Sequence, residues 1–455
     1  MSQNITHVIH LMMENRSYDH LLADVTDHET LISAPGVNFE SDGTRHQQRI
    51  VTLKGDPITI DPPHGHETAL QSLGNDDNTG FIKALEDYPR DVYPKETFPQ
   101  IMYTIQRGDL FALHTLASEY CVCRQWFSSV PGPTRPNRSF ALSGTSKGSL
   151  SGGMSPAQIK YNDQVTVFDR LAEAGIPWRI YYGDIPTCLT LNRLHHPDQL
   201  AHVHKLERFF VDVAGPESLF PQYCFLEPNY VVNATDYHPV NDNEARSEKF
   251  VADVYNALVR NPALFAKTLL VITFDEHGGF YDHMVPPTTV APDDLRPKDA
   301  DPESDSSFQF DRLGFRVPAL LISPWLQRGA VDDTVYDHTS LLKHLTAKWG
   351  LGPLGHRTEA TNDPADNNLW TTEPRTDVRE IDLTALATWQ QTMIPTQKTD
   401  FIEILNEITG YLDRSTDSEG LDRLNAVVTD LVRLRDSLKQ RRQNLCDKLR
   451  NLFRC

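Results

Sequence analysis

Short apolar runs that end in polar residues recur along this chain, and they constrain its fold more than any other feature. Each of the clearest runs is short enough for one buried strand, and they cover residues 8–13, 177–182, 223–226, 268–274 and 317–323. Between these runs, apolar side chains recur at helical spacing over residues 165–174, 248–260 and 340–349. The alternation predicts an α/β fold in which helices cover both faces of a large, mostly parallel sheet.

The length of 455 residues exceeds one average domain but fits a large α/β core with an appendage. We expect one α/β domain over residues 1–370, a linker over 371–398 and a helical C-terminal extension over 399–455. Within the first domain, residues 28–66 and 287–308 are rich in Asp, Pro, Gly and Ser. These two segments predict excursions from the sheet that form walls of a substrate site.

The C-terminal extension carries a heptad pattern. Apolar residues follow 3-4 spacing, and arginines fill two seam positions. The pattern comprises Leu421, Leu424, Val428, Leu431, Arg435, Leu438, Arg442, Leu445, Leu449 and Leu452. Such a helix packs either on its own domain or on a second copy of the chain. We favour homo-oligomerisation, because arginines at seam positions suit a partner helix that supplies carboxylates.

Composition excludes several classes of protein. A formal net charge of -19 repels nucleic acid and anionic membranes, so a nucleic-acid-binding module is not expected. Six cysteines without a C-x-x-C pair predict mostly free thiols. No uninterrupted apolar run reaches the roughly 18 residues of a membrane-spanning helix. The first residues show no basic leader, so we expect a cytoplasmic protein or one exported by a leaderless route.

Polar side chains follow three of the predicted strands: Glu14 with Asn15, Glu227, and Asp275 with Glu276. Because carboxyl ends of parallel strands meet at one edge of a sheet, where ligands bind, we expect these side chains to lie close together. Adjacent carboxylates repel one another unless a cation or protons lie between them. One acidic pair alone is more typical of a solvated turn, but two such clusters predict a shared metal ion.

Residues 132–138 read Gly-Pro-Thr-Arg-Pro-Asn-Arg and form a rigid turn around Thr134. A threonine hydroxyl is a weak nucleophile unless a base or a metal ion lowers its pKa. Catalysis by Thr134 therefore requires that this residue lie at the cation. A Pro-rich loop without a catalytic role is the plainer interpretation of this motif taken alone.

A competing motif, Gly144-Thr145-Ser146-Lys147-Gly148, matches the G-x-S-x-G nucleophile elbow, with Asp337-His338 downstream. This motif is the basis of an alternative hypothesis, a serine esterase or lipase with Ser146 as its nucleophile. The elbow needs a helix after it, which the Ser- and Gly-rich residues 149–156 disfavour. A non-enzymatic alternative is a scaffold that binds a phosphorylated ligand and recruits a partner through its C-terminal helices.

Five strings occur in a fixed order between about residue 5 and residue 350: HVIHLMMENRSYDH, PGPTRPNRSFALSGTSKG, TFDEHGGFYDHMVPP, GFRVPALLISPW and YDHTSLLKHL. They resemble the successive motifs of the bacterial phosphoesterase family that holds phosphatidylcholine-cleaving phospholipases C and acid phosphatase A. The resemblance implies an alkaline-phosphatase-like fold, a phosphoesterase catalytic domain over residues 1–370 and one divalent metal ion. It also implies that the metal ligands are Glu14, Asn15, Thr134, Asp275 and Glu276.

The same resemblance implies roles for three residues in catalysis. Thr134 matches the hydroxyl nucleophile, His64 resembles the histidine that contacts the phosphate, and His238 resembles the one near the leaving group. His66 is an alternative to His64, because it follows closely in the same motif. Structural roles are expected for three further histidines, His277, His283 and His338. Arg138 could offer charge to the phosphate, but a structural ion pair is an equal alternative, so we do not place Arg138 in the site.

The activity implied is that of a phospholipase C, which hydrolyses the glycerol-side phosphodiester of phosphatidylcholine-like phospholipids through a phosphothreonine intermediate. Acid phosphatase activity on phosphomonoesters is the alternative. Hard oxygen ligands leave Ca²⁺, Mg²⁺, Mn²⁺ and Zn²⁺ open. A choline headgroup would need an aromatic cage, and the candidates are Tyr18, Tyr103, Trp126, Tyr182 and Tyr281.

Overall fold

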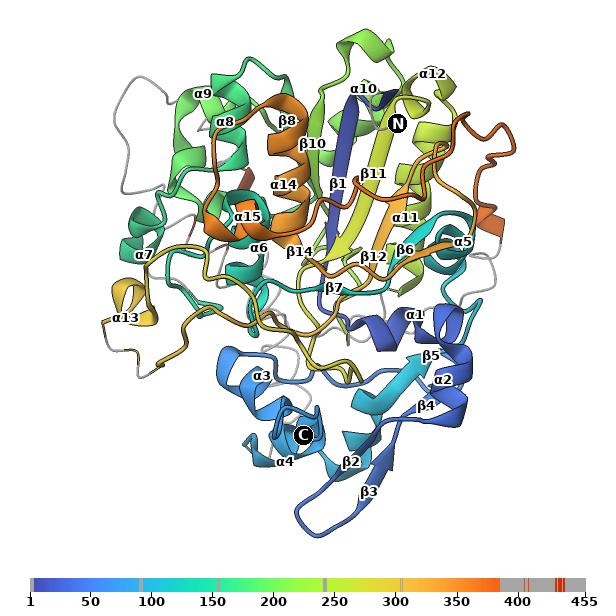
Figure 1. The fold of residues 1–455 in the computed structure, drawn as a ribbon, viewed down its shortest axis with the longest axis vertical. Coiled ribbons are helices and arrows are strands. Elements are labelled where there is room, and N and C mark those ends of the chain that lie inside the picture. The colour runs from blue at the N-terminus through green and yellow to red at the C-terminus, as the bar shows by residue number, and fades with distance from the viewer. Residues whose placement is uncertain are drawn as a thin grey trace, which may run out of the picture.

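A central sheet of eight strands organises the molecule (Figure 1). The computed structural model describes residues 4–89, 93–153, 156–239, 244–302, 304, 306–384, 405, 408, 430, 431, 433–435 and 437. From one edge to the other the strands are β13 (Ala330–Asp332), β6 (Cys121–Cys123), β12 (Ala319–Ile322), β11 (Thr268–Phe274), β1 (His7–Met13), β10 (Tyr223–Glu227), β8 (Trp178–Tyr182) and β9 (Val203–Lys205). Strand β12 runs antiparallel to its neighbours β11 and β6, whereas the other neighbouring pairs are parallel. The predicted large, mostly parallel sheet is confirmed.

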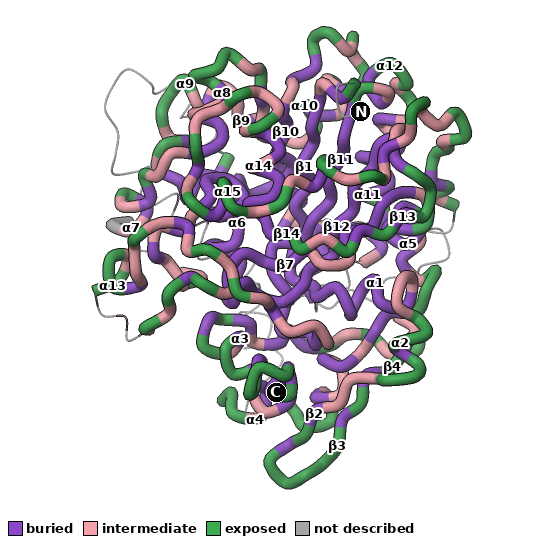
Figure 2. The backbone as a smooth tube through the Cα atoms, viewed as in Figure 1, coloured by how far each residue is buried: buried purple, intermediate pink, exposed green. Residues whose placement is uncertain are grey.

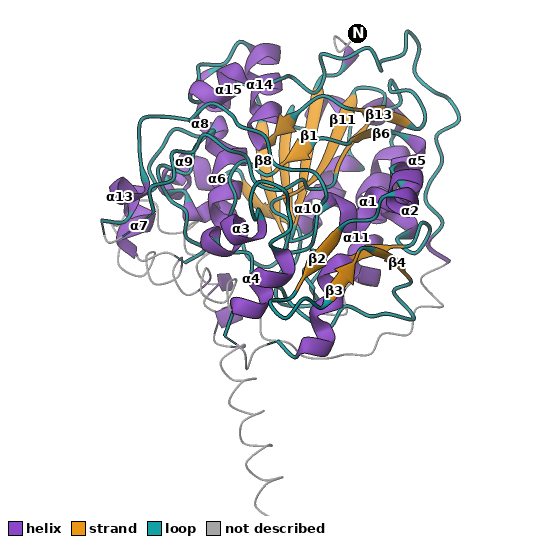
Figure 3. Ribbon diagram, turned by 60° about the horizontal axis from the view of Figure 1, so that its bottom comes forward, coloured by secondary structure: helices purple, strands orange, loops and turns teal. Residues whose placement is uncertain are grey.

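Helices lie against both faces of this sheet (Figure 3). In one layer, α6 (Thr134–Ser143) packs on α8 (Val167–Glu173) and α14 (His338–Trp349). In the other, α11 (Glu244–Val259) packs on α5 (Phe111–Glu119) and α10 (Leu206–Val213). Shorter helical elements complete the shell: α1 (Tyr18–Thr26), α7 (Pro156–Tyr161), η3 (Thr187–Thr190), η4 (Asn192–His195), α9 (Pro197–Leu200), η5 (Glu217–Leu219), α12 (Pro262–Phe265), α13 (Pro297–Ala300) and α15 (His356–Ala360).

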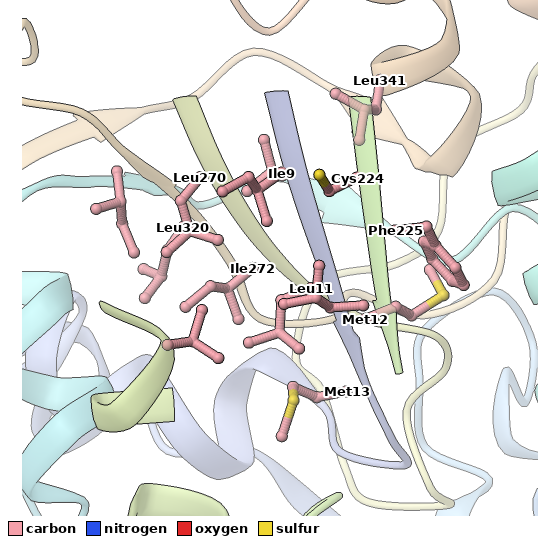
Figure 4. Close-up of a cluster of buried hydrophobic side chains, with 14 of the residues drawn as sticks. Ile9, Leu11, Met12, Met13, Cys224, Phe225, Leu270, Ile272, Leu320 and Leu341 are labelled. Carbon is pink, nitrogen blue, oxygen red and sulfur yellow. The ribbon is translucent and has the colours of Figure 1, made fainter. Parts of the chain in front are cut away.

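Strand β1 lies at the centre of the sheet and explains why the apolar runs are continuous. Each of its residues is buried, because helices cover both faces of a parallel strand. Its side chains Ile9 and Leu11 pack with Leu270 and Ile272 of β11 in the main hydrophobic core (Figure 4). The tube in Figure 2 shows this burial along the central strands. Each of the other four predicted runs likewise contains a strand of the sheet.

A small region lies beyond the carboxyl ends of β1 and β11, at the bottom of Figure 1. It contains α2 (His28–Ser33), β2 (Val37–Phe39), β3 (Arg45–Gln47), β4 (Arg49–Val51), α3 (His66–Ser72), α4 (Phe81–Asp87), η2 (Lys95–Met102) and β5 (Tyr103–Ile105). Strand β2 pairs with β3, and β4 with β5. Phe81 and Ile101 build a separate hydrophobic cluster here with Tyr281 and Phe315. The excursion predicted over residues 28–66 therefore covers the edge of the sheet where the polar strand ends meet.

Two further short strands, β7 (Trp126–Phe127) and β14 (Tyr336–Asp337), pair in parallel beside the main sheet. Among the cysteines, Cys121, Cys123, Cys188 and Cys224 are free and buried, as predicted. Within the part of the chain that the structure describes, no helix has the length and apolar character needed to cross a membrane.

The C-terminal extension lies largely outside the described residues, as do all its heptad positions except Leu431 and Arg435. Leu431 is fully buried and belongs to the main hydrophobic core, so at this position the helix packs on its own domain. The described part of the predicted linker also contacts the domain, because Asn256 Nδ2 donates to the carbonyl oxygen of Ile381 at 3.0 Å. The division into domains, like homo-oligomerisation, stays a prediction.

Candidate active site

The two acidic clusters predicted to share a metal ion lie side by side. Met13 pairs with Phe274 at the ends of β1 and β11, so Glu14 and Asp275 leave neighbouring strands together. Carboxylate oxygens of Glu14, Asp275 and Glu276 all lie within 4.8 Å of one another, and all three residues are buried. Asp275 Oδ1 accepts hydrogen bonds from the backbone N–H groups of Asn15 at 3.1 Å and Glu276 at 2.9 Å. The bond from Asn15 joins the two strand ends, and the bond from Glu276 fixes the Asp275 side chain within its own segment.

Asn15 takes an unusual backbone conformation in this cluster. Its φ of 66° lies in the left-handed region, which asparagine tolerates better than most residues. Gly278 packs directly on Asn15, and a Cβ on Gly278 would lie 2.7 Å from the Asn15 carbonyl carbon. With a φ of 66° itself, Gly278 is required here for both its conformation and its lack of a side chain. The backbone thus presents the Asn15 amide to the acidic cluster.

The donor set fits a metal ion. Asn15 Oδ1 and Glu276 Oε1 are buried and accept no hydrogen bond from any described residue. Buried acceptors of this kind normally have a partner, and a cation supplies one. Carboxylate and amide oxygens are hard ligands of the type that Ca²⁺, Mg²⁺ and Mn²⁺ prefer. Glu14, Asn15, Asp275 and Glu276 are therefore able to hold a metal ion.

Thr134 lies at the first position of α6, directly after Pro133. Its hydroxyl donates to Glu14 Oε1 at 2.7 Å, which places the predicted nucleophile on a predicted metal ligand. Asn137 fixes the turn before the helix, since its Oδ1 accepts from Val130 N at 3.0 Å and its Nδ2 donates to Gly132 O at 3.1 Å. The turn predicted over residues 132–138 is only partly confirmed, because helix α6 already begins at Thr134. The loop before the helix directs Thr134 towards the acidic cluster.

Burial and charge shape the electrostatics of Glu14. Burial raises the pKa of its carboxyl well above the usual range, and the neighbouring Asp275 raises this pKa further. The Arg138 guanidinium opposes the shift and favours the ionised carboxylate. Two carboxylates this close are costly to ionise together without a cation between them. The cluster is thus a place where added positive charge is strongly favoured.

The prediction for Arg138 was wrong in part, because this residue is indeed an ion-pair partner but lies inside the site. Its Nη2 donates to Glu14 Oε2 at 2.8 Å and its Nε donates to Asp275 Oδ2 at 2.9 Å. Its Nη1 lies 3.5 Å from Oε1 of Glu227, the acidic residue at the end of β10. The sequence contained one signal for this placement. Arg138 lies four residues after Thr134, and residues with this spacing lie on the same face of a helix.

Two of the predicted histidines lie next to each other beside the cluster. The rings of His64 and His238 are 6.4 Å apart between centroids, in an edge-to-face arrangement. His64 Nε2 lies 3.9 Å from Glu276 Oε1, and His238 Nε2 lies 3.6 Å from Oδ2 of Asp61. His64 Nδ1 is within hydrogen-bond distance of the Pro62 carbonyl, at 2.7 Å, so Nε2 is the nitrogen turned to the cluster.

His66, the alternative to His64, has a different environment. Its Nδ1 donates to the Pro131 carbonyl at 2.6 Å, and its ring packs edge-to-face on Phe308. Burial lowers its pKa, which favours the neutral ring. His66 thus holds the loop before Thr134, whereas His64 contacts a candidate metal ligand. The geometry therefore favours His64 over His66 as the histidine that acts in the site.

The three histidines expected to be structural all contact other residues of the protein, and their roles stay predictions. His338 Nε2 donates to the Asp275 carbonyl at 2.7 Å and buttresses the strand end that carries two candidate ligands. His277 packs on Phe315, with ring centroids 4.6 Å apart. His283 Nδ1 lies 2.9 Å from Asp19 Oδ2.

A second acidic cluster, Asp19 with Asp282 and His283, lies close by and has an internal cation. Arg316 is fully buried and donates to Asp19 Oδ1 at 2.7 Å and to Asp282 Oδ1 at 2.8 Å. The remaining carboxylate oxygens accept from backbone and Gln48 donors. This cluster ties the loop after β11 to α1 and has no need of a metal ion.

The aromatic residues proposed for a choline cage do not form one. Tyr18, Tyr182 and Trp126 are buried, and Tyr281 packs within the small hydrophobic cluster. The faces of three of these rings are already covered by cationic side chains of the protein itself: Arg316 over Tyr18, Arg49 over Tyr103 and Lys205 over Tyr182. The cage prediction is wrong for these five residues, because Tyr18, Tyr103 and Tyr182 already have a cation over the ring, and Trp126 and Tyr281 pack inside hydrophobic clusters.

The nucleophile-elbow interpretation of Ser146 is also wrong. Ser146 follows helix α6 instead of a strand, and the next helix, α7, begins only at Pro156. Its hydroxyl donates to the Ser149 carbonyl at 2.7 Å. His338, the elbow's predicted partner, contacts Asp275 instead. An elbow requires an exposed serine between a strand and a helix. Ser146 is buried, and it does not lie between a strand and a helix.

A hydroxyl held on a carboxylate, next to buried oxygen ligands and two neighbouring histidines, is an arrangement typical of a hydrolase that acts on an ester. Comparison with known proteins gives the particular family. A model described as the Phosphoesterase family matches residues 5–352. The chain therefore belongs to the phosphoesterase family, and it is a phosphoric ester hydrolase, as the sequence motifs predicted.

Relatives with assigned activities are similar along most of the chain. Non-specific phospholipase C6 of Arabidopsis thaliana is 32% identical over 389 residues, covering 81% of this chain and 73% of that protein. Phospholipase C B of Mycobacterium tuberculosis is 27% identical over 391 residues, covering 76% and 74%. An alkaline phosphatase superfamily structure from Vibrio parahaemolyticus aligns with a TM-score of 0.32 and 14% identity, over 68% of this chain and 82% of that one. A structural likeness this low adds nothing to the sequence comparison.

Proposed function

We propose that this chain is a phospholipase C that uses one divalent metal ion to hydrolyse the glycerol-side phosphodiester of phospholipids. The observation that carries the proposal is the Thr134 hydroxyl, which donates to Glu14 Oε1 at 2.7 Å beside the unpartnered oxygens of Asn15 and Glu276. Similarity to phospholipases C at 27–32% identity supports a phospholipid as the ester. The metal ion, when bound, neutralises a nonbridging phosphate oxygen and lowers the pKa of the nucleophile.

In the first step, Thr134 Oγ1 attacks phosphorus and the bond from phosphorus to the glycerol oxygen breaks. As Oγ1 attacks, its proton passes to Glu14 Oε1, which already accepts the hydroxyl hydrogen bond at 2.7 Å. His238 Nε2 donates a proton to the departing glycerol oxygen, a contribution of about 10²- to 10⁴-fold for a positioned acid. The products of this step are diacylglycerol and a phosphothreonine that carries the headgroup phosphate.

In the second step, His238 Nε2 takes a proton from water, and the water oxygen attacks the phosphothreonine. The bond from phosphorus to Thr134 Oγ1 breaks and the phosphorylated headgroup leaves, while Oγ1 takes its proton back from Glu14. His64, whose Nε2 lies 3.9 Å from Glu276 Oε1, donates to a phosphate oxygen from Nε2 in its protonated form, because Nδ1 already donates to the Pro62 carbonyl. Each role needs only side chains that the fold brings to this edge of the sheet.

The test compares Thr134→Ala with Ser146→Ala, which removes a buried hydroxyl outside the acidic cluster. Release of phosphocholine from phosphatidylcholine and of phosphate from a monoester is measured with chelator and with Mg²⁺, Ca²⁺, Mn²⁺ or Zn²⁺ restored singly. We expect Thr134→Ala to lose at least about 10³-fold in kcat and Ser146→Ala to match the wild type. Chelation should abolish the wild-type activity. Diester cleavage that survives both Thr134→Ala and chelation contradicts the proposal, and cleavage of the monoester alone replaces the phospholipase with a phosphatase.

A further inference from the structure

Arg138 links three strand ends from a single position. It lies one helical turn after Thr134 on α6, and its side chain is almost completely buried. In addition to its hydrogen bonds to Glu14 and Asp275, it donates from Nη2 to the Met13 carbonyl at 3.2 Å. Its Nη1 makes no hydrogen bond to the described residues and lies 3.5 Å from Glu227 Oε1. One guanidinium thereby contacts residues at the ends of β1, β11 and β10.

The Glu14 carboxylate is held at both oxygens by the same helix. Thr134 donates to Oε1 at 2.7 Å and Arg138 donates to Oε2 at 2.8 Å. Because the two donors are four residues apart on a rigid helix, the carboxylate has one orientation relative to the nucleophile. Asp275 is held in a similar way, with Oδ2 on Arg138 and Oδ1 on two backbone N–H groups.

We propose that Arg138 is a positioning residue that orients the metal-ligand carboxylates of Glu14 and Asp275 and fixes them relative to Thr134. The inference rests on the proposed function, since it assigns these carboxylates to a metal ion. The planar guanidinium donates to two carboxylates at once, which a lysine ammonium on a flexible stem does not reproduce. When a residue that hydrogen-bonds to a metal ligand, without binding the metal itself, is replaced, metal affinity or activity typically falls by about 10- to 100-fold.

If Arg138 formed only a structural ion pair, its replacement would lower stability without changing the affinity for a divalent ion. The ring of Tyr230 lies 5.1 Å from the Arg138 guanidinium carbon, and Glu227 is buried beside it, so loss of Arg138 also disturbs packing. Destabilisation alone therefore does not distinguish the two roles. Affinity for a divalent ion does, because it reports the alignment of Glu14 and Asp275 in the folded protein.

The experiment titrates Mg²⁺, Ca²⁺, Mn²⁺ and Zn²⁺ singly into the full chain by calorimetry, for the wild type, Arg138→Lys and a matched control, Arg357→Lys. Arg357 is an equally buried arginine that donates to the backbone carbonyls of Ser129, Val290 and Phe310 and makes no contact with Glu14 or Asp275. Thermal unfolding in chelator measures the stability of each variant. Steady-state kinetics at saturating metal separate kcat from KM.

We expect Arg138→Lys to bind the ion about 10- to 100-fold more weakly than the wild type, with a lower kcat and little change in KM. Arg357→Lys should lose stability and keep its metal affinity. Wild-type affinity in Arg138→Lys overturns the inference, whether or not the variant is less stable. If Arg138→Lys does not fold, Arg138→Gln takes its place, because it too removes the paired hydrogen bonds to Glu14 and Asp275: weaker metal binding supports the inference, and unchanged binding overturns it. If the wild type binds metal but does not cleave phospholipid, the proposed function is refuted. The metal affinities of the wild type and Arg138→Lys still test the positioning role of Arg138 in that case.

Discussion

Gly278→Ala tests whether the left-handed backbone at the acidic cluster determines the site. A Cβ at this position would lie 2.7 Å from the Asn15 carbonyl carbon, and closer still to the two oxygens of Asn15. No real Cβ contact is so short, so either Asn15 or the loop after β11 must move. In addition, the φ of 66° at Gly278 is unfavourable for alanine by about 1–2 kcal/mol.

The structure supplies a control that separates these two effects. Gly175 has a φ of 67°, and a Cβ there would meet nothing within 4 Å. Gly175→Ala therefore carries the conformational cost of about 1–2 kcal/mol alone. Gly278→Ala carries that cost together with about 1–3 kcal/mol from overpacking, so we expect a total loss of about 2–5 kcal/mol.

The measurements are the free energy of unfolding in urea and the rate of phosphodiester hydrolysis. Gly278→Ala should lose stability and also activity, because the displaced Asn15 amide is a candidate metal ligand. Gly175→Ala should lose a smaller part of its stability and keep its kcat. Equal stabilities for the two variants, or full activity in Gly278→Ala, would refute the argument that close packing on Asn15 shapes the site.

Two further predictions concern stability. His114 accepts from Gly108 N at 2.9 Å, and its Nε2 donates to the Leu21 carbonyl; burial lowers its pKa from 6.5 to about 4. A histidine that is neutral in the folded state contributes stability that is present above pH 6.5 and lost as the pH falls towards 4. The stability of wild type relative to His114→Gln should therefore fall by about 3 kcal/mol between pH 7 and pH 4 in urea unfolding, and a constant difference would contradict this. Leu431→Ala should lower the unfolding free energy by about 2–5 kcal/mol, because Leu431 is buried in the main hydrophobic core. The molar mass measured by light scattering should stay the same. A shift to smaller species would instead support packing of this helix against a second chain.

Much of the fold follows from local sequence pattern. Each of the predicted apolar runs contains a strand, because a strand buried on both faces needs a continuous apolar stretch whatever its partners are. The positions of Glu14 and Asp275 follow from the same pattern, since polar residues directly after parallel strands reach one edge of the sheet. Thr134 was identified by its motif, but the helix that begins at this residue was not predicted, because Pro133 and Pro136 on either side of it favour a turn when the sequence is considered alone.

The orientation of side chains within the site was decided by tertiary structure. The sequence left His64 and His66 as alternatives, and the distinction depends on the Pro131 carbonyl and the Phe308 ring, both distant in sequence. The proposed aromatic cage failed for a similar reason, because the sequence does not show which ring faces are already covered by Arg316, Arg49 or Lys205.

Arg138 shows the limit of local pattern most clearly. Its spacing from Thr134 was visible in the sequence, yet its hydrogen bonds reach Glu14 and Asp275, 124 and 137 residues away. Periodicity reports which face of a helix or strand is buried, and this is a local property of the chain. Which carboxylate meets which guanidinium depends on how that helix packs against the sheet, and packing is fixed only when distant segments come together.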